Sequence, residues 1–339
     1  MLRKDYLGEN IIETIYFGGG TPSILEVSDL RLILKIIYDN YNISKDPEIT
    51  LEANPDDLCL DKAIELRQSG FNRLSIGIQS FHEEILQYLN RSHSATQAYE
   101  AIENVTKAGF NNFSTDLIFA ISDNHLSITK DDINTLLRYK VPHISTYSLT
   151  IEPNTVFGNW LHKDKIGEVP ADNSAEEFEF IIEKLSGKGY EHYEVSNFAL
   201  PGFLSQHNSN YWRQIPYLGV GPSAHSYNGI SRQFNINNNS LYIRSIEKGE
   251  IPLKTDYLTD TDRINEEIMV GLRTKWGCDF NRLKKMYKID LFKIHKKYVE
   301  KLIEHDLATF FNGKLQLSKN GMLIADKISA DFFIINKKH

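Results

Sequence analysis

Three consecutive glycines are the first feature of the sequence that points to chemistry. Gly18, Gly19 and Gly20 follow the apolar run that ends at Phe17, and Thr21 comes next. Glycine has no side chain, so a ligand can approach the backbone there and contact its amides and carbonyls. The loop is followed by no Gly-Lys-Ser/Thr sequence, and it does not fit a Gly-x-Gly-x-x-Gly pattern. The glycines therefore predict close approach of a ligand without identifying it.

A carboxylate at the end of the next apolar run is a second candidate. In residues 51–57, Leu-Glu-Ala-Asn-Pro-Asp-Asp, Asn54 fits a helix N-cap and Pro55 fits the first helical position. Those local roles leave Glu52 unexplained. A carboxylate on a buried strand costs stability unless it is paired. A ligand role for Glu52, such as binding ribose hydroxyls, is therefore as well supported as a structural one.

Gln79 and Asp116 also end apolar runs, and Arg91 lies in a polar linker. Ser80 and Glu83 fit a capping box, which explains Ser80 but not Gln79. Arg91 stands between two expected helices, where a solvated arginine is the ordinary case. Taken one at a time, each of these residues favours a structural role.

His207 opens a segment of different character, which reads His-Asn-Ser-Asn-Tyr-Trp over residues 207–212. A histidine followed by Tyr211 and Trp212 suits an axial haem ligand beside stacking surfaces. The alternative is a loop histidine without a ligand role, which is the commoner case.

Cys59 and Cys278 are the only cysteines, and they lack CxxC spacing. They predict neither a disulfide framework nor a cysteine metal site, and both are expected to be buried thiols. No run approaches the ~20 apolar residues of a membrane span, and the N-terminus lacks the apolar core of a signal peptide. These features predict a cytoplasmic protein.

The elements that position these residues alternate between strands and helices. Strands are expected at residues 14–17, 48–52, 73–79, 112–119, 143–149 and 192–196, with amphipathic helices at 27–41, 96–108 and 175–185. This alternation predicts an α/β fold with a parallel sheet. Because strand after strand ends in a polar residue, a β/α barrel with a site on its C-terminal rim is favoured.

A second domain is expected beyond residue 230, which gives domains at 1–230 and 231–339. The net charge is −13 in the first segment and +6 in the second. The later segment has helical patterns at 262–274, 280–287 and 291–305, then a hairpin at 307–311 and 314–317 joined by Asn312-Gly313. This pattern predicts a helical, winged-helix-like accessory domain.

A basic run in the second domain admits two interpretations. Nucleic acid or an anionic membrane would attract the charges, whereas their helical spacing favours the solvated face of two helices. The acidic first domain also argues against a nucleic-acid partner. The residues are Arg282, Lys284, Lys285, Lys288, Lys293, Lys296 and Lys297.

Taken together, the segments resemble the family of HemW-type haem chaperones, relatives of oxygen-independent coproporphyrinogen III oxidase in the radical SAM superfamily. The resemblance covers nearly the whole chain and is carried by TIYFGGGTPS, ITLEANPDDL, NRLSIGIQSF, STDLIF, HISTYSLTIEPNT, YEVSNFA, HNSNYW and YLGVGPSAHS. The HNxxYW motif marks the chaperones and is not expected in the oxidases, so it favours the chaperones.

The resemblance implies two ligands and the residues that bind them. S-adenosylmethionine (SAM) would be bound by Gly19, Gly20, Thr21, Glu52, Gln79, Arg91 and Asp116. Haem would be bound by His207, Asn208, Tyr211 and Trp212, with His207 as the candidate iron ligand. No residue is assigned to catalysis.

Two departures from the family pattern matter. Family members begin with a strand that ends in CxxxCxxC, whose thiolates bind a [4Fe-4S] cluster. This sequence lacks the motif, so we expect an incomplete radical-SAM (β/α) barrel without its first βα unit, through a truncated or misassigned start or a gene remnant. Without the cluster ligands no catalysis is expected. Residues 120–124 also lack the usual Gly-Leu-Pro-Gly-type turn.

The expected function is haem binding and delivery of haem to acceptor proteins, including membrane-associated respiratory enzymes. The enzyme alternative is a coproporphyrinogen III oxidase-like protein of porphyrin biosynthesis, inactive here without the cluster cysteines. Whether the chain is an enzyme and whether it forms a homodimer are left open.

Overall fold

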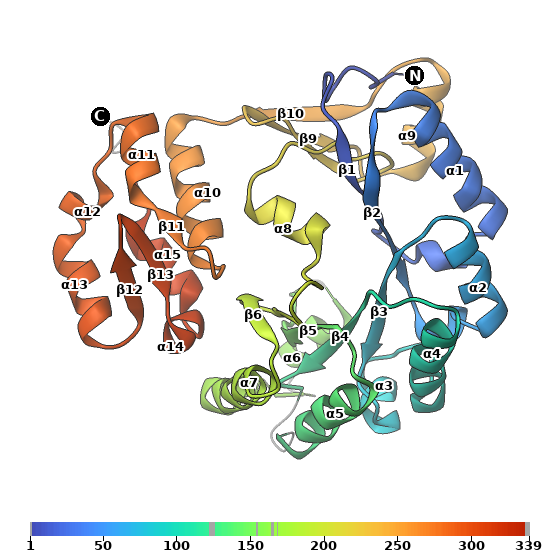
Figure 1. The fold of residues 1–339 in the computed structure, drawn as a ribbon, viewed down its shortest axis with the longest axis horizontal. Coiled ribbons are helices and arrows are strands. Elements are labelled where there is room, and N and C mark those ends of the chain that lie inside the picture. The colour runs from blue at the N-terminus through green and yellow to red at the C-terminus, as the bar shows by residue number, and fades with distance from the viewer. Residues whose placement is uncertain (1, 122–125, 154, 164–165, 168, 336–339) are drawn as a thin grey trace. The chain divides into compact units, whose positions relative to one another are not determined.

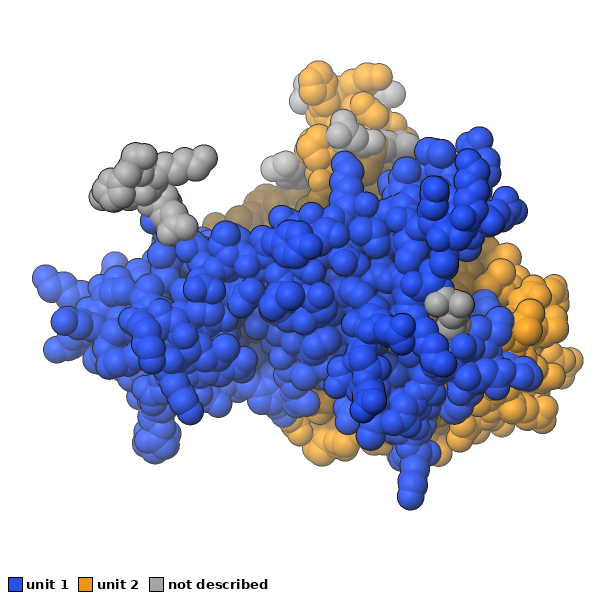
Figure 2. All heavy atoms as spheres, turned by 90° about the horizontal axis from the view of Figure 1, so that it is seen from above, with its two compact units in different colours: residues 1–14, 33–47, 206–339 blue, residues 15–32, 48–205 orange. Residues whose placement is uncertain are grey.

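The computed structural model describes residues 2–121, 126–153, 155–163, 166–167 and 169–335. The chain forms two compact units, which Figure 2 shows in different colours. The first unit, labelled unit 2 in Figure 2, contains Ile15–Leu32 and Glu48–Ser205. The second unit, labelled unit 1 there, contains Met1–Thr14, Ile33–Pro47 and Gln206–His339. These units divide the chain differently from the domains expected at 1–230 and 231–339, and that boundary stays a prediction.

A seven-stranded sheet carries the candidate ligand-binding residues of the first unit. Its strand order is β1-β2-β3-β4-β5-β7-β6, with parallel pairing from β2 to β5 and antiparallel pairing at β7 and β6. The strands are β1 Ile12–Phe17, β2 Ile43–Ala53, β3 Arg73–Gln79, β4 Phe113–Phe119, β5 His143–Ser148, β6 Glu191–Glu194 and β7 Asn197–Ala199. The expected α/β fold with a parallel sheet is confirmed, whereas the antiparallel β7 was not predicted.

Helices cover one face of this sheet (Figure 1). They are α1 Val27–Asn40, α2 Leu60–Gln68, α3 Glu83–Tyr88, α4 Ala95–Lys107, α5 Leu126–Tyr139, α6 Val156–His162 and α7 Ala171–Ser186. Strand residues on the covered face, such as Leu51, Leu74 and Ile144, are fully buried. Burial of aliphatic side chains between sheet and helices is the main source of stability for such a layer.

The opposite, inner face of the sheet is polar. Side chains alternate between the two faces along a strand, so the residues beside Leu51, Leu74 and Ile144 point inward. The inner-face residues are Thr50 and Glu52 on β2, Arg73 and Ser75 on β3, Ser114 and Asp116 on β4, and His143 and Ser145 on β5. A filled β/α barrel has layers of branched aliphatic side chains at these positions. Five of these residues are at most 2% exposed and form a buried polar layer, whereas Glu52, Ser75 and Asp116 remain partly exposed.

The second unit contains a small antiparallel sheet that the sequence patterns did not predict. The order is β10-β9-β8, from β8 His225–Tyr227, β9 Ser231–Asn235 and β10 Leu253–Tyr257. Helix α8, Gln206–Trp212, precedes this sheet, and α9, Asn239–Glu247, connects β9 to β10.

The C-terminal part of this unit has the expected accessory architecture. It comprises α10 Asp260–Leu272, β11 Cys278–Asp279, α11 Phe280–Tyr287, α12 Leu291–Ile294, α13 Lys296–Glu304, β12 Ala308–Phe311, β13 Lys314–Leu317, α14 Lys319–Met322 and α15 Ala325–Phe332. Asn312 and Gly313 join β12 to β13 with φ values of 51° and 79°, as a two-residue hairpin turn requires. The hairpin prediction is confirmed, and β11 adds a third strand beside β13.

The basic run lies on α11, α12 and α13 and on the residues beside them. The helix expected at 291–305 is divided in two at His295, so the run covers three helices rather than two. All seven basic side chains are exposed, as expected for a solvated face. None of the helices in the described part of the chain has the length and apolar content that crossing a membrane requires.

Candidate functional site

The glycine loop after β1 is fixed to the end of β2 through Glu52. The Tyr16 hydroxyl donates a hydrogen bond to Glu52 Oε1 at 2.6 Å, and the Gly19 amide donates to Oε2 at 3.1 Å. A Cβ atom on Gly18 would lie 2.5 Å from Tyr16 Cε1 and 2.7 Å from Glu52 Oε1, so that position requires glycine. Gly19 and Gly20 have φ values of 81° and 143°, and a Cβ on either would meet open space. The loop thus presents free backbone beside an oriented carboxylate.

A polar cradle forms at the end of the neighbouring strand β3. A register shift between Ile76 and Gln79 ends the strand, and Gln79 has a φ of 65°. A Cβ on Gly77 would lie 2.9 Å from Gln79 Nε2, 3.3 Å from Arg91 Nη2 and 3.8 Å from Asn54 Oδ1. Three polar side chains therefore meet above a residue that has no side chain of its own.

Arg91 is part of this cradle, so the expectation of a solvated arginine is wrong. Its Nη2 donates to Asn54 Oδ1 at 2.9 Å, and burial lowers its pKa, partly offset by Asp56 and Asp116. Its Nε is buried and has no hydrogen-bond partner among the described residues. Asn54 does precede a short helix with Pro55 at its first position, as expected, but its side chain serves Arg91 rather than a capping amide.

Ser80, at the end of the same strand, is not part of a capping box, so that expectation is also wrong. Its hydroxyl donates to Asp132 Oδ2 at 2.8 Å, and the N-cap of α3 is His82. The Glu83 carboxylate instead accepts from the Ala95 amide at 2.9 Å. Burial raises the pKa of Asp132 to about 6, against the lowering effect of hydrogen bonds from Phe81 and Ser80. These contacts are structural, and Gln79 takes part in none of them.

Asp116 places a second carboxylate on the inner face. Burial raises its pKa to about 6, although hydrogen bonding to Ser145 and the charge of Arg73 act in the opposite direction. Tyr147 on β5 is 43% exposed, and its pKa is also raised, first by partial desolvation and second by the negative charge of Asp116. Asp116 is therefore partly protonated near neutral pH and can accept or donate a hydrogen bond.

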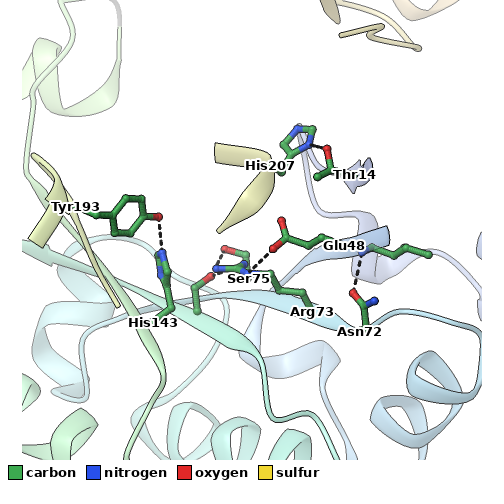
Figure 3. Close-up of polar contacts among 10 residues, drawn as sticks. Thr14, Glu48, Asn72, Arg73, Ser75, His143, Tyr193 and His207 are labelled. Carbon is green, nitrogen blue, oxygen red and sulfur yellow. Dashed lines mark hydrogen bonds and ion pairs between the residues drawn. The ribbon is translucent and has the colours of Figure 1, made fainter. Parts of the chain in front are cut away.

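A deeper polar layer of the inner face, shown in Figure 3, was missed from sequence. Arg73 is 2% exposed, its Nε lies 3.8 Å from Glu48 Oε2, and its Nη1 donates to Ser114 Oγ at 3.3 Å. His143 Nε2 lies 2.7 Å from the Tyr193 hydroxyl, and burial holds the pKa of His143 well below its usual value. This layer could have been predicted from the sequence, because charged or polar residues occupy alternate positions of otherwise apolar strands.

The HNxxYW motif lies on helix α8, so its histidine is not a loop residue. His207 Nδ1 lies 2.8 Å from Thr14 Oγ1 (Figure 3). Its Nε2 lies 2.9 Å from the hydroxyl of Tyr211, an exposed residue. Tyr211 also packs edge-on against Tyr217, with ring centroids 4.8 Å apart. Trp212, at the end of the helix, stacks with the guanidinium of Arg273. Asn208 is partly exposed on the same helix.

The chemical groups of the described residues fit one of the two cofactors of the family but not the other. The open space beside Gly19 and Gly20, the Glu52 carboxylate held by the Gly19 amide, and the unpaired Arg91 Nε fit a ligand with amino, carboxylate and ribose hydroxyl groups, such as SAM. A cluster of the CxxxCxxC type needs three thiolates, whereas the sequence holds two cysteines. Cys278 is buried as expected, but Cys59 is exposed, which corrects that expectation, and the two belong to different compact units. These two thiols do not fit such a cluster.

Thr21 and residues 120–124 are the remaining positions for which the sequence made a prediction. Thr21 follows the glycines and precedes a short helix that begins at Pro22. Ala120 has a φ of 55°, and its amide donates to Glu177 Oε2 at 3.3 Å. Residues 122–124 of the expected unusual turn lie outside the described residues.

Parallel strands with a glycine loop after β1, Glu52 near the end of β2 and Asp116 in the middle of β4 fit a protein of the radical SAM class. The family model of the radical SAM superfamily matches residues 3–146, and that of the HemN C-terminal domain matches residues 258–324. The chain is also 33% identical to two haem chaperones HemW, of whose length it covers 85% and 86%, and it therefore belongs to the HemW family of haem chaperones.

Relatives and a solved structure support that assignment. The chain is 33% identical over 323 residues to the haem chaperone HemW of Lactococcus lactis, covering 95% of this chain and 85% of the relative. It is 33% identical over 327 residues to HemW of Bacillus subtilis, covering 96% and 86%. The fold matches that of coproporphyrinogen III oxidase (HemN) from Escherichia coli with a TM-score of 0.79 at 21% identity, covering 98% of this chain and 81% of that one. The named relatives favour the chaperones over the oxidase alternative.

Proposed function

We propose that this chain binds haem through helix α8, holds SAM at the carboxyl ends of the sheet strands, and delivers haem to acceptor proteins. The observation that carries the haem proposal is the pair of hydrogen bonds to His207. Its Nδ1 is engaged by Thr14, while its Nε2 is directed to the exposed side. An axial histidine ordinarily has one nitrogen bound to a partner that fixes the ring and the other nitrogen toward the metal.

The proposal requires one of these hydrogen bonds to change when haem binds. If Nδ1 carries the proton and donates it to Thr14, then Nε2 holds the lone pair that iron requires. In this structure the Tyr211 hydroxyl donates to that lone pair, so it has to turn away before Nε2 can bond to iron. Tyr211 is 41% exposed, which leaves its ring room to move and then to cover the macrocycle.

The SAM proposal assigns a role to each group of the first site. The Gly19 and Gly20 backbone and Thr21 would hold the amino-acid end, and Glu52 would accept hydrogen bonds from the ribose. Gln79 and Arg91 would bind the remaining polar groups, with Asp116 beside them. SAM supplies an activated sulfonium nucleoside when bound. We derive no radical step, because the two thiols described above do not fit a cluster.

The acceptors and the compartment are parts of the same proposal. Membrane-associated respiratory enzymes remain the predicted acceptors, since they require haem after synthesis, and the cytoplasm is the compartment that we propose. A homodimer also stays a prediction.

Haemin titration with two histidine variants tests the haem proposal. The wild-type protein is expected to give a shifted Soret band, which His207→Ala removes while circular dichroism shows an intact fold. His225→Ala is the matched control, because His225 is exposed on β8 and packs on Phe234. Equal loss in both variants, or loss in neither, would contradict ligation by His207.

A further inference from the structure

Two arginine–tryptophan stacks connect the end of α8 to the segment between α10 and β11. The Arg213 Cζ atom lies 4.6 Å from the ring centroid of Trp276, and the Arg273 Cζ atom lies 5.7 Å from the ring centroid of Trp212. All four residues belong to one compact unit. The HNxxYW motif is therefore adjacent to two arginine side chains, Arg213 and Arg273, each packed against a tryptophan ring.

The two arginines differ in what their guanidinium groups contact. Arg273 forms an ion pair with Asp326 on α15. Arg213 is exposed, and no hydrogen bond or ion pair joins its side chain to any other residue that the structure describes. A guanidinium packed against an indole keeps its planar set of N–H donors available at its edge. Arg213 thus has a defined orientation and unused donors.

We propose that Arg213 binds a carboxylate of the molecule carried at α8, which for haem is a propionate group. This inference rests on the proposed function and adds the ligand group that Arg213 recognises. A guanidinium edge matches a carboxylate with two parallel hydrogen bonds. Because Trp276 already orders the side chain, little additional rotamer entropy is lost when the carboxylate binds.

The position of Arg213 along α8 is compatible with one ligand that contacts both residues. The Arg213 amide donates to the Ser209 carbonyl at 3.0 Å, so the helical path continues past Trp212. Arg213 is six positions after His207, which places it about 9 Å along the helix axis and about 120° around it. The long side chain of Arg213 can span this offset, so its guanidinium would reach a carboxylate at the edge of a macrocycle held by His207.

Haemin and its dimethyl ester test this recognition, because they share the iron and the macrocycle, whereas methylation removes the charge of the propionates. Wild-type protein is expected to bind haemin about tenfold more tightly than the ester, the ordinary effect of one charge-assisted hydrogen-bonded pair. Arg213→Gln should remove most of that difference by weakening haemin binding. Arg213→Lys, which keeps the charge without the planar fork, should retain part of it.

The matched control is Arg244→Gln, since Arg244 is an exposed arginine on α9 of the same unit. It should leave the preference for haemin unchanged, with circular dichroism checking the fold of every variant. If His207→Ala abolishes the Soret shift but Arg213→Gln retains the full preference, the proposal for Arg213 is overturned and the proposed function stands. If Arg213→Gln removes the preference while His207→Ala has no effect, Arg213 is supported and His207 ligation fails. No saturable binding of haemin would overturn both.

Discussion

The Thr14 hydroxyl and Nδ1 of His207 lie 2.8 Å apart, although 193 residues separate them in the sequence. The contact gives β1 a direct influence on the imidazole. Thr14→Val keeps the shape of the side chain and removes the hydrogen bond. We expect haemin affinity to fall about tenfold, as is typical when the outer partner of a ligating histidine is removed.

Absorption titration at the Soret band measures that change. Thr255→Val on the exposed strand β10 is the matched control and should bind haemin as the wild type does. An unchanged affinity in Thr14→Val would show that the hydrogen bond does not orient the ligand.

Tyr16 is expected to act on SAM through Glu52. Tyr16→Phe removes the donor that fixes Oε1, so the carboxylate gains freedom and loses orientation. We expect SAM affinity to fall roughly fivefold, equivalent to about 1 kcal/mol for one hydrogen bond. Equilibrium dialysis with labelled SAM measures it. Tyr38→Phe, a change at a 48% exposed tyrosine on α1, should have no effect, and equal affinity in both variants would exclude a role for Tyr16.

Asp116 should make the protein less stable as pH rises. Its native pKa is about 6 against an ordinary value of 3.8, so between these values the native state holds more protons than the unfolded chain. Stability therefore falls with rising pH across this window. A shift of two units corresponds to at most about 3 kcal/mol.

Asp116→Asn removes this titration and should stabilise the protein at pH 7.5 but not at pH 4. Urea unfolding at the two pH values gives the comparison. A stability difference between variant and wild type that is the same at both would refute the raised pKa.

Gly77→Ala should disturb the cradle without unfolding the sheet. The new methyl group would meet Gln79 Nε2 and Arg91 Nη2, which are ends of flexible side chains and can move. We expect SAM affinity to drop by about an order of magnitude, the effect of losing one or two hydrogen bonds. Gly167→Ala is the control, because a Cβ there meets nothing within 4 Å. Unaltered SAM binding would show that Gln79 and Arg91 are not contacts.

Local patterns were sufficient to predict most strands and helices of the parallel sheet. The period-two alternation of β3 and the 3.6-residue spacing of α1 are properties of short segments, so they can be recognised without knowing the partners. The Asn312-Gly313 turn was predictable for the same reason, since positive φ values at two successive residues restrict the residue types.

Contacts between segments that lie far apart in the sequence could not be predicted from the sequence alone. Ser80 satisfies a local capping pattern, yet its hydroxyl bonds to Asp132, 52 residues away. Arg91 has the sequence context of a solvated arginine, but folding brings Asn54 to its guanidinium. In both cases a hydrogen-bond partner far away in the sequence replaced the local alternative, and no short-range spacing encodes that partner.

Ligands bound at the two sites will differ in the heat capacity change that accompanies binding. The inner face of the sheet offers hydroxyl, amide and charged groups, so a ligand there displaces water mainly from polar surface. A macrocycle against Tyr211 and Trp212 covers apolar surface instead, and only that kind of burial gives a strongly negative heat capacity change. Calorimetry at several temperatures therefore identifies, from the slope of the binding enthalpy alone, which surface a new ligand has covered.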